Sequence, residues 1–181
     1  MIILTGKTGS GKSTVIRALS LAGFNRVVTC TTRPMRAGEA DGRDYHFFDE
    51  GTFQKMKKDG MFAETSHTGR YSYGSLKESY EDPNGVVILD PDGVRSVVEA
   101  VGKEQTTVFF LDAPDALLRD RIIKRGDDPH NALKRLHEDN LRYEGFTLFD
   151  YRIQQNEKSS AGDIAELISQ IAKRGGQKWN L

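Results

Sequence analysis

Hydrophobic residues occur in short runs separated by polar and glycine-rich stretches, and their spacing predicts alternating strands and helices. Short apolar or β-branched runs predict strands at Ile2–Leu4, Val27–Cys30, Tyr45–Phe48, Met61–Ser66, Val86–Leu89 and Val108–Leu111. Helical spacing predicts helices over Lys12–Ala22, Asp49–Asp59, Pro114–Lys124 and Pro129–Tyr143, and a last one bearing Ile164, Leu167, Ile168 and Ile171. Such alternation is typical of an α/β fold, in which helices flank a parallel sheet on both faces.

The stretch from about Thr32 to Tyr80 breaks this alternation. It is rich in turn residues and aromatic residues, and we interpret it as a small β-rich insertion. The predicted organisation is a core of residues 1–31, 81–118 and 144–181, an insertion of residues 32–80 and a helical segment of residues 119–143.

Charge and cysteine content exclude several classes of protein. The 181 residues carry 26 basic and 26 acidic side chains, so the formal net charge is zero. This balance argues against nucleic acid or a membrane surface as partner, and the longest aliphatic run, Val86–Leu89, is far shorter than the ~20 residues of a membrane span. The start lacks the apolar stretch of a secretory signal, and Cys30 is the single cysteine. We therefore expect a cytoplasmic protein without an internal disulfide or a thiolate metal cluster.

One segment carries a phosphate-binding motif. Residues 6–13 read G-K-T-G-S-G-K-S and match G-x-x-x-x-G-K-[ST], between a predicted strand and a predicted helix. The glycines let the backbone approach phosphates, Lys12 would reach the β- and γ-phosphates, and the Ser13 hydroxyl would sit on Mg²⁺. The predicted ATP-binding residues of the loop are Gly6, Lys7, Thr8, Gly9, Ser10, Gly11, Lys12, Ser13 and Thr14. The loop alone leaves hydrolysis, switching and phosphoryl transfer open.

A second segment narrows the possible functions of the phosphate-binding motif. Residues 31–48 read T-T-R-P-M-R-A-G-E-A-D-G-R-D-Y-H-F-F and resemble the nucleotide-acceptor segment of guanylate kinases, T-T-R-x-x-R-x-G-E-x-x-G-x-x-Y-x-F. Three further segments follow in the order of that family: Tyr71–Ser75, Asp90–Asp92 and Arg121–Gly126. The resemblance extends from Ile3 to about Glu157. It implies a P-loop NTPase fold with a nucleotide-acceptor insertion and a helical lid, and an Mg²⁺-dependent enzyme that converts ATP and GMP to ADP and GDP.

Charge explains why such an acceptor segment would need arginines. A nucleoside monophosphate and ATP are both polyanions, so bringing them together requires surrounding cations. Arg33 and Arg36 can each hold a phosphate with two donors, a geometry that lysine does not offer. The resemblance implies that Tyr45 and Tyr73 add phenolic hydroxyls to the same phosphate, and it places Glu39 in the same GMP-binding segment.

Recognition of the base requires different groups. A carboxylate can accept from both N1–H and the N2 amino group of guanine, whereas it would face the N1 acceptor of adenine unfavourably. Glu64 matches the base-reading glutamate of the family, and Asp92 is expected to act beside it. Ser75 could donate to guanine O6, and Thr29 stands where the family more often has serine.

The resemblance also implies how the reaction proceeds. The attacking oxygen of GMP is already ionised, so no general base is assigned. Asp90 follows a predicted strand and can hold a Mg²⁺-bound water, which makes Ser13 and Asp90 the metal-site residues. Lid arginines would fold over the phosphates, and Asn156 lies in the stretch near adenine in the family. The predicted catalytic residues are Lys12, Arg33, Arg121, Arg125 and Arg135.

Two alternatives remain, and the chain has a second departure from the family pattern besides Thr29. The acceptor could be dGMP or another monophosphate, or the chain could be a guanylate-kinase-like binding module, although such modules typically have a degraded phosphate loop. The run Asp90-Pro91-Asp92-Gly93-Val94 lacks the glutamine that commonly precedes the glycine in the family. A monomer and a homodimer are both compatible with the sequence.

Overall fold

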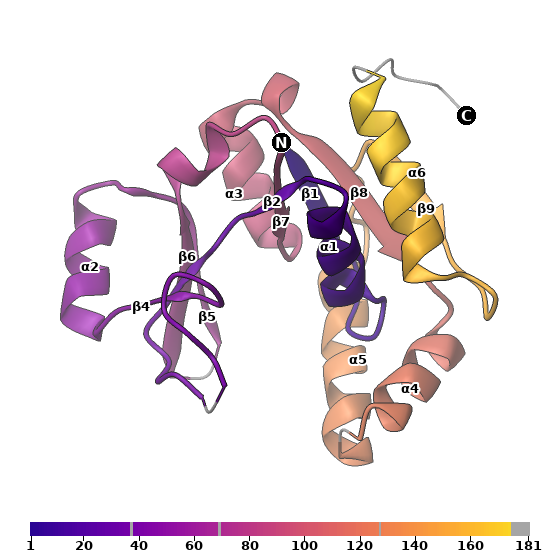
Figure 1. Cartoon of the computed structure of the whole chain (residues 1–181). Coiled ribbons are helices and arrows are strands. Elements are labelled where there is room, and N and C mark those ends of the chain that lie inside the picture. Colours follow the sequence, from indigo (N-terminus) through magenta and orange to yellow (C-terminus); the bar gives the residue numbers. More distant parts are fainter. Residues whose placement is uncertain (37, 69, 127, 175–181) are drawn as a thin grey trace.

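A parallel five-stranded sheet forms the centre of the computed structural model, which describes residues 1–36, 38–68, 70–126 and 128–174 (Figure 1). The strand order is β2-β7-β1-β8-β9. Their bounds are β2 Asn25–Arg26, β7 Gly85–Ile88, β1 Ile2–Thr5, β8 Thr107–Asp112 and β9 Tyr151–Gln154. Because β1 is the central strand, the segment that follows it leaves the middle of the carboxyl edge, where ligands of open α/β sheets bind.

Helices cover both faces of this sheet. Ile2 and Leu4 of β1 pack in one core cluster with residues of α1 (Lys12–Leu21) and α6 (Ala161–Lys173), and Ile3 between them packs in a second cluster. That second cluster includes residues of α3 (Pro91–Val101) and the end of α5 (Pro129–Tyr143). The predicted α/β class with a helix-flanked parallel sheet is therefore confirmed. Among the described residues, no helix combines the length and the apolar character needed to span a bilayer.

A separate four-stranded sheet lies to one side of the core, with α2 (Glu50–Lys58) against it (Figure 1). Phe53 of α2 stacks on Phe62, with ring centroids 4.5 Å apart. The strand order is β4 (His46–Phe47), β3 (Cys30–Thr31), β6 (Tyr71–Leu76) and β5 (Phe62–Thr68). This sheet occupies the β-rich stretch that the sequence indicates, although β3 begins two residues before the expected boundary at residue 32.

The single strand predicted at Val27–Cys30 is wrong. The chain instead forms β2 in the central sheet and β3 in the second sheet, and residues 27–29 cross between them. Val27 still donates from its backbone N–H to the carbonyl of Val86 at 2.9 Å, whereas Cys30 pairs with Gly74. The β-branched run is continuous in sequence, but its two ends have partners in different sheets.

Three elements have no counterpart among the expected ones: β6, β9 and α3. For α3 the signals are local, because the Asp90 carboxylate caps the helix by accepting from Gly93 N–H at 2.8 Å and Pro91 occupies the first turn. Two short 3₁₀ turns, η1 (Lys77–Tyr80) and η2 (Lys103–Gln105), flank this part of the chain. Below the core, α4 (Asp115–Lys124) and α5 pack against each other (Figure 1).

Candidate active site

The phosphate loop depends on two glycines for different reasons. A Cβ on Gly6 would lie 2.4 Å from the carbonyl oxygen of Leu111, so the loop leaves β1 too close to β8 for any side chain. Gly11 has open space around it, but its φ of 86° is a left-handed conformation at the start of α1. The constraint at Gly6 comes from β8 and that at Gly11 from its backbone conformation, while their predicted approach to phosphates stays a prediction.

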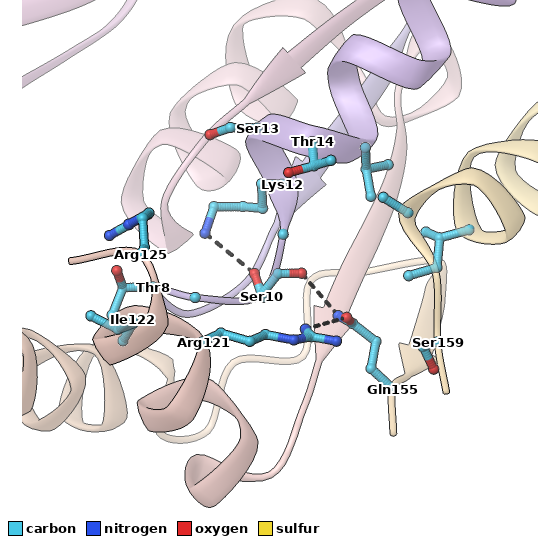
Figure 2. Close-up of a pocket in the computed structure, with 15 residues that line it drawn as sticks. Thr8, Ser10, Lys12, Ser13, Thr14, Arg121, Ile122, Arg125, Gln155 and Ser159 are labelled. Carbon is cyan, nitrogen blue, oxygen red and sulfur yellow. Dashed lines mark hydrogen bonds between the residues drawn. The ribbon is translucent and has the colours of Figure 1, made fainter. Parts of the chain in front are cut away.

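Lys12 lies inside the loop. Its Nζ donates to the carbonyl oxygens of Gly6 at 2.5 Å and Lys7 at 2.9 Å. It also donates to Ser10 Oγ at 3.4 Å (Figure 2). Burial lowers the pKa of Lys12 to about 8, while the negative charge of Asp139 opposes this shift. The ammonium is thus held by backbone oxygens that an incoming anion can replace.

A pocket of about 420 Å³, which we call the loop pocket, collects most of the predicted ATP-binding residues. Arg121 of α4 and Arg125, the residue directly after α4, also line it. Gln155 was not predicted; it donates from Nε2 to the Ser10 carbonyl at 3.0 Å and accepts from Arg121 Nη1 at 2.8 Å (Figure 2). The residues from the phosphate loop and α1 in this pocket are Thr8, Gly9, Ser10, Gly11, Lys12, Ser13, Thr14 and Val15.

Three predicted ATP-binding residues lie outside the lining of the loop pocket, and one of them, Gly6, lines the pocket described next. Asn156 lines an adjoining hollow of about 310 Å³ together with Ser159 and Ile164, which also line the loop pocket. Lys7 pairs with Asp115 at the start of α4, with Nζ and Oδ1 3.0 Å apart. The structure thus groups the predicted ATP residues around one end of the central sheet.

A second pocket of about 330 Å³, the insertion pocket, opens between the central sheet and the second sheet. Thr8 and Lys12 line both pockets, so the two cavities meet at the phosphate loop. Five of the predicted GMP or metal residues line the insertion pocket: Thr29, Tyr45, Glu64, Tyr73 and Asp90. Ser66, Asp139 and Tyr143 also line it and were not predicted.

Glu64 has the most unusual environment of the insertion pocket. Its Oε1 accepts from the Ser75 hydroxyl at 2.9 Å, and Ser75 Oγ lies 2.6 Å from the hydroxyl of Tyr80. Burial raises the pKa of Glu64 to about 7, and the charge of Asp90 acts in the same direction. A carboxyl group of this kind is a candidate for recognising a specific ligand rather than an ordinary surface charge.

Arg33 is buried and held by a carboxylate. Its guanidinium makes two hydrogen bonds to Glu39, at 3.0 and 2.8 Å, and lies over the rings of Tyr45 and Phe47. The paired carboxylate raises the pKa of Arg33 further. Glu39 also accepts from the backbone N–H of Arg36 at 2.7 Å, while the Arg36 side chain is exposed.

The remaining predicted residues lie further out. Asp92 is exposed and pairs with Arg95 at 2.7 Å, so it does not line the insertion pocket beside Glu64. Arg135 is exposed on α5. The two predicted metal residues are on opposite sides of the phosphate loop: Ser13 lines the loop pocket, and Asp90 lines the insertion pocket and pairs with Arg142 at 3.1 Å.

The Ser13 hydroxyl and the Asp90 carboxylate are oxygen ligands of the kind that bind Mg²⁺ in complex with a nucleotide. The part of the chain that the structure describes contains no group of three or more side chains able to hold a metal ion by themselves. Mg²⁺ commonly uses one or two protein oxygens and takes its other ligands from water and substrate phosphates. A serine hydroxyl and a carboxylate that acts through water would therefore be sufficient protein ligands.

Helix α5 contributes two contacts that sequence reasoning missed. The Tyr143 hydroxyl accepts from Gly6 N–H at 2.8 Å, donates to the Gly6 carbonyl at 2.9 Å and lies 2.8 Å from Thr5 Oγ1. Asp139 Oδ2 accepts from Thr8 N–H at 2.5 Å. Their spacing of four residues places both side chains on the same helix face, which was the one available signal.

Comparison with known proteins gives the family. A sequence model of guanylate kinase matches residues 1–171. The chain belongs to the guanylate kinase family. The guanylate kinase of Thermotoga maritima is 34% identical over 96% of this chain and 86% of its own length. That of Symbiobacterium thermophilum is 35% identical over 92% and 82%, respectively.

Solved structures agree with this guanylate kinase fold. The crystal structure of guanylate kinase from Anaplasma phagocytophilum superposes with a TM-score of 0.73 at 23% identity, covering 98% of this chain and 86% of that one. Shikimate kinase from Acinetobacter baumannii has a TM-score of 0.55 at 18% identity, covering 98% and 94%. The predicted family and the P-loop kinase fold are thus confirmed, and the chain is a nucleotide-binding kinase.

Proposed function

We propose that this member of the guanylate kinase family transfers the γ-phosphoryl group of ATP to GMP, giving ADP and GDP in an Mg²⁺-dependent reaction. The observation that carries the proposal is that Thr8 and Lys12 line both pockets. ATP in the loop pocket and GMP in the insertion pocket would therefore bring their phosphates together at one lysine.

The loop pocket supplies the positive charge for ATP. Backbone N–H groups of the loop and the start of α1 favour phosphate, and Lys12 would leave the Gly6 and Lys7 carbonyls to bind the β- and γ-phosphates. Arg121 and Arg125 would complete the cage from α4, with Arg135 joining them from the lid. Asn156 would lie near adenine.

The insertion pocket supplies recognition of GMP. Ionised Glu64 would accept from N1–H and N2 of guanine, with Ser75 and Thr29 beside it. Arg33 and Arg36 would bind the phosphate together with Tyr45 and Tyr73, and Glu39 orients Arg33 beforehand. A role for Asp92 requires its carboxylate to leave Arg95.

Catalysis in this site is positioning and charge neutralisation. The GMP phosphate oxygen is the nucleophile and is already ionised, so no side chain has to remove a proton. Ser13 and, through water, Asp90 would hold Mg²⁺, which neutralises charge on the β- and γ-phosphates. Residues 119–143 would close over the phosphates and exclude water that otherwise hydrolyses ATP.

An acceptor panel tests the proposal. Formation of ADP and of the nucleoside diphosphate is measured with ATP and Mg²⁺ against all common NMPs and dNMPs. We expect the highest kcat/KM with GMP and turnover of dGMP at a lower or similar value. A higher kcat/KM with AMP or UMP would remove the guanine assignment, and folded protein without any acceptor-dependent ADP formation would indicate a binding module.

A further inference from the structure

The carboxylate of Asp139 lies where the two pockets meet. Its Oδ2 accepts from the Thr8 backbone N–H at 2.5 Å, and Asp139 lines the insertion pocket together with Lys12. Thr8 and Lys12 are the two residues shared by both lining sets. An acidic side chain is therefore hydrogen-bonded to one of the two residues that the pockets share.

The fold holds Asp139 in this position through its neighbours on α5. One turn later, the Tyr143 hydroxyl is bound to both the N–H and the carbonyl of Gly6. Asn140 Nδ2 donates to Asp115 Oδ2 at 2.7 Å, and Asp115 in turn pairs with Lys7. Helix α5 is thus attached to the phosphate loop directly at Gly6 and, through Asp115 of α4, indirectly at Lys7, and these two contacts flank Asp139.

A carboxylate at this point conflicts with a bound polyphosphate. The N–H groups of a phosphate loop point toward the anion that the loop binds, and Asp139 already uses the N–H of Thr8. Its charge also acts on Lys12, where it offsets the effect of burial. Phosphate and carboxylate are both anions with the same kind of acceptor oxygen, so they compete for the same donors.

We propose that Asp139 is an internal competitor of the ATP phosphates, holding the Thr8 N–H while the loop pocket is empty and releasing it when ATP binds. The residue thereby sets how strongly the loop pocket binds polyphosphate. It also couples the contact between α5 and the phosphate loop to the binding of ATP. The inference rests on the proposed function, because it requires ATP to bind the loop pocket.

Calorimetric titration with ATP in EDTA tests the competition without any turnover. Asp139→Asn keeps the size of the side chain and removes its charge, and we expect its Kd for ATP to fall by roughly tenfold, since charge-assisted hydrogen bonds are about twice as strong as neutral ones. Glu138→Gln is the matched control, because Glu138 is an exposed neighbour on the same helix and loses the same charge. Its Kd is expected to stay within twofold of the wild type.

The amide signal of Thr8 gives a second measurement that needs no variant. In ¹H–¹⁵N spectra of the wild type, this N–H is expected far downfield without nucleotide, and it should move when ATP saturates the site. An unchanged or raised Kd in Asp139→Asn, or a Thr8 signal that ATP does not move, would overturn the inference. A wild-type chain that binds no ATP would overturn the proposed function as well, whereas ATP binding unaffected by Asp139→Asn overturns the inference alone.

Discussion

Ser75 and Glu64 are cross-strand partners on β6 and β5, and the serine hydroxyl donates to the glutamate at 2.9 Å. The hydrogen bond favours the carboxylate, but burial outweighs it and brings the pKa of Glu64 to about 7. The charge of this residue therefore changes close to neutral pH, in the pocket to which we assign the guanine base.

The first prediction concerns the pH dependence of GMP binding. Guanine recognition requires ionised Glu64, so GMP affinity should rise as pH increases through about 7. Glu64→Gln should weaken GMP binding by about tenfold or more at pH 8, because a charged hydrogen bond is lost. The affinity for ATP should stay within a factor of about two of the wild type. Titration calorimetry from pH 5.5 to 8.5 measures the GMP and ATP affinities of the wild type and of Glu64→Gln. Because the GMP phosphate titrates equally with both proteins, the difference between their pH profiles reports on Glu64.

The same pKa predicts a stability effect. A folded-state pKa raised above 4.5 means that the native protein keeps a proton which the unfolded chain has lost. The free energy of unfolding should therefore decrease as pH rises from about 4.5 to about 7, and Glu64→Gln should lack this contribution. Urea unfolding at several pH values measures it; identical pH profiles for both proteins would contradict the raised pKa.

The second prediction concerns Lys12. Lys12→Ala removes the charge expected at the β- and γ-phosphates, so turnover should fall by roughly 10²- to 10³-fold. Lys57→Ala on α2, an exposed lysine of the second sheet's helix, is the control. Steady-state kinetics with ATP and GMP provides the measurement, and turnover within threefold of the wild type would remove Lys12 from the phosphate site.

The third prediction concerns the hydroxyl of Tyr143. Tyr143→Phe keeps the stack on Phe110, whose ring centroid is 5.4 Å away, and leaves buried groups of Thr5 and Gly6 without their partner. The free energy of unfolding should fall by about 1–3 kcal/mol. Tyr71→Phe, which removes a hydroxyl that accepts from exposed Arg70, should cost clearly less. Equal costs of the two substitutions, measured by urea unfolding, would mean that the Tyr143 hydroxyl contributes nothing specific.

The fourth prediction compares two glycines with positive φ. Gly23→Ala places a Cβ in open space at φ 93° and should cost about 1–2 kcal/mol from backbone strain alone. Gly6→Ala adds a contact of 2.4 Å with the Leu111 carbonyl, so its cost in unfolding free energy should be larger. Thermal unfolding of both variants separates strain from steric overlap, and equal melting temperatures would show that β1 and β8 can move apart.

Local sequence patterns were sufficient to predict an element when its motif or its apolar spacing lies entirely within that element. The Gly6–Ser13 motif predicted the loop between β1 and α1, and the apolar stripe from Ile164 to Ile171 predicted α6. The run Val27–Cys30 misled because its pairing partners, Val86 and Gly74, lie about fifty residues further along the chain. No local rule distinguishes one strand from two short ones in different sheets.

The residues of the candidate site likewise fall into those that local motifs predict and those that only the tertiary packing brings in. Family motifs predicted Glu64, Tyr45 and Tyr73, which all line the insertion pocket. Asp139 was not predicted, because its contact with Thr8 arises when α5 packs against a loop 131 residues away. Asp92 was expected to share the role of Glu64 in recognising the base, which stays a prediction; in the structure the first turn of α3 places it against Arg95.

The Arg33–Glu39 pair has a consequence for how tightly a monophosphate can be held. An unrestrained arginine loses side-chain freedom when it grips an anion, and that loss weakens binding. Here the fork of the guanidinium is already fixed by two hydrogen bonds and two aromatic rings. The cost of ordering this side chain therefore falls on folding, and in the function we propose the monophosphate would meet a guanidinium that is already oriented.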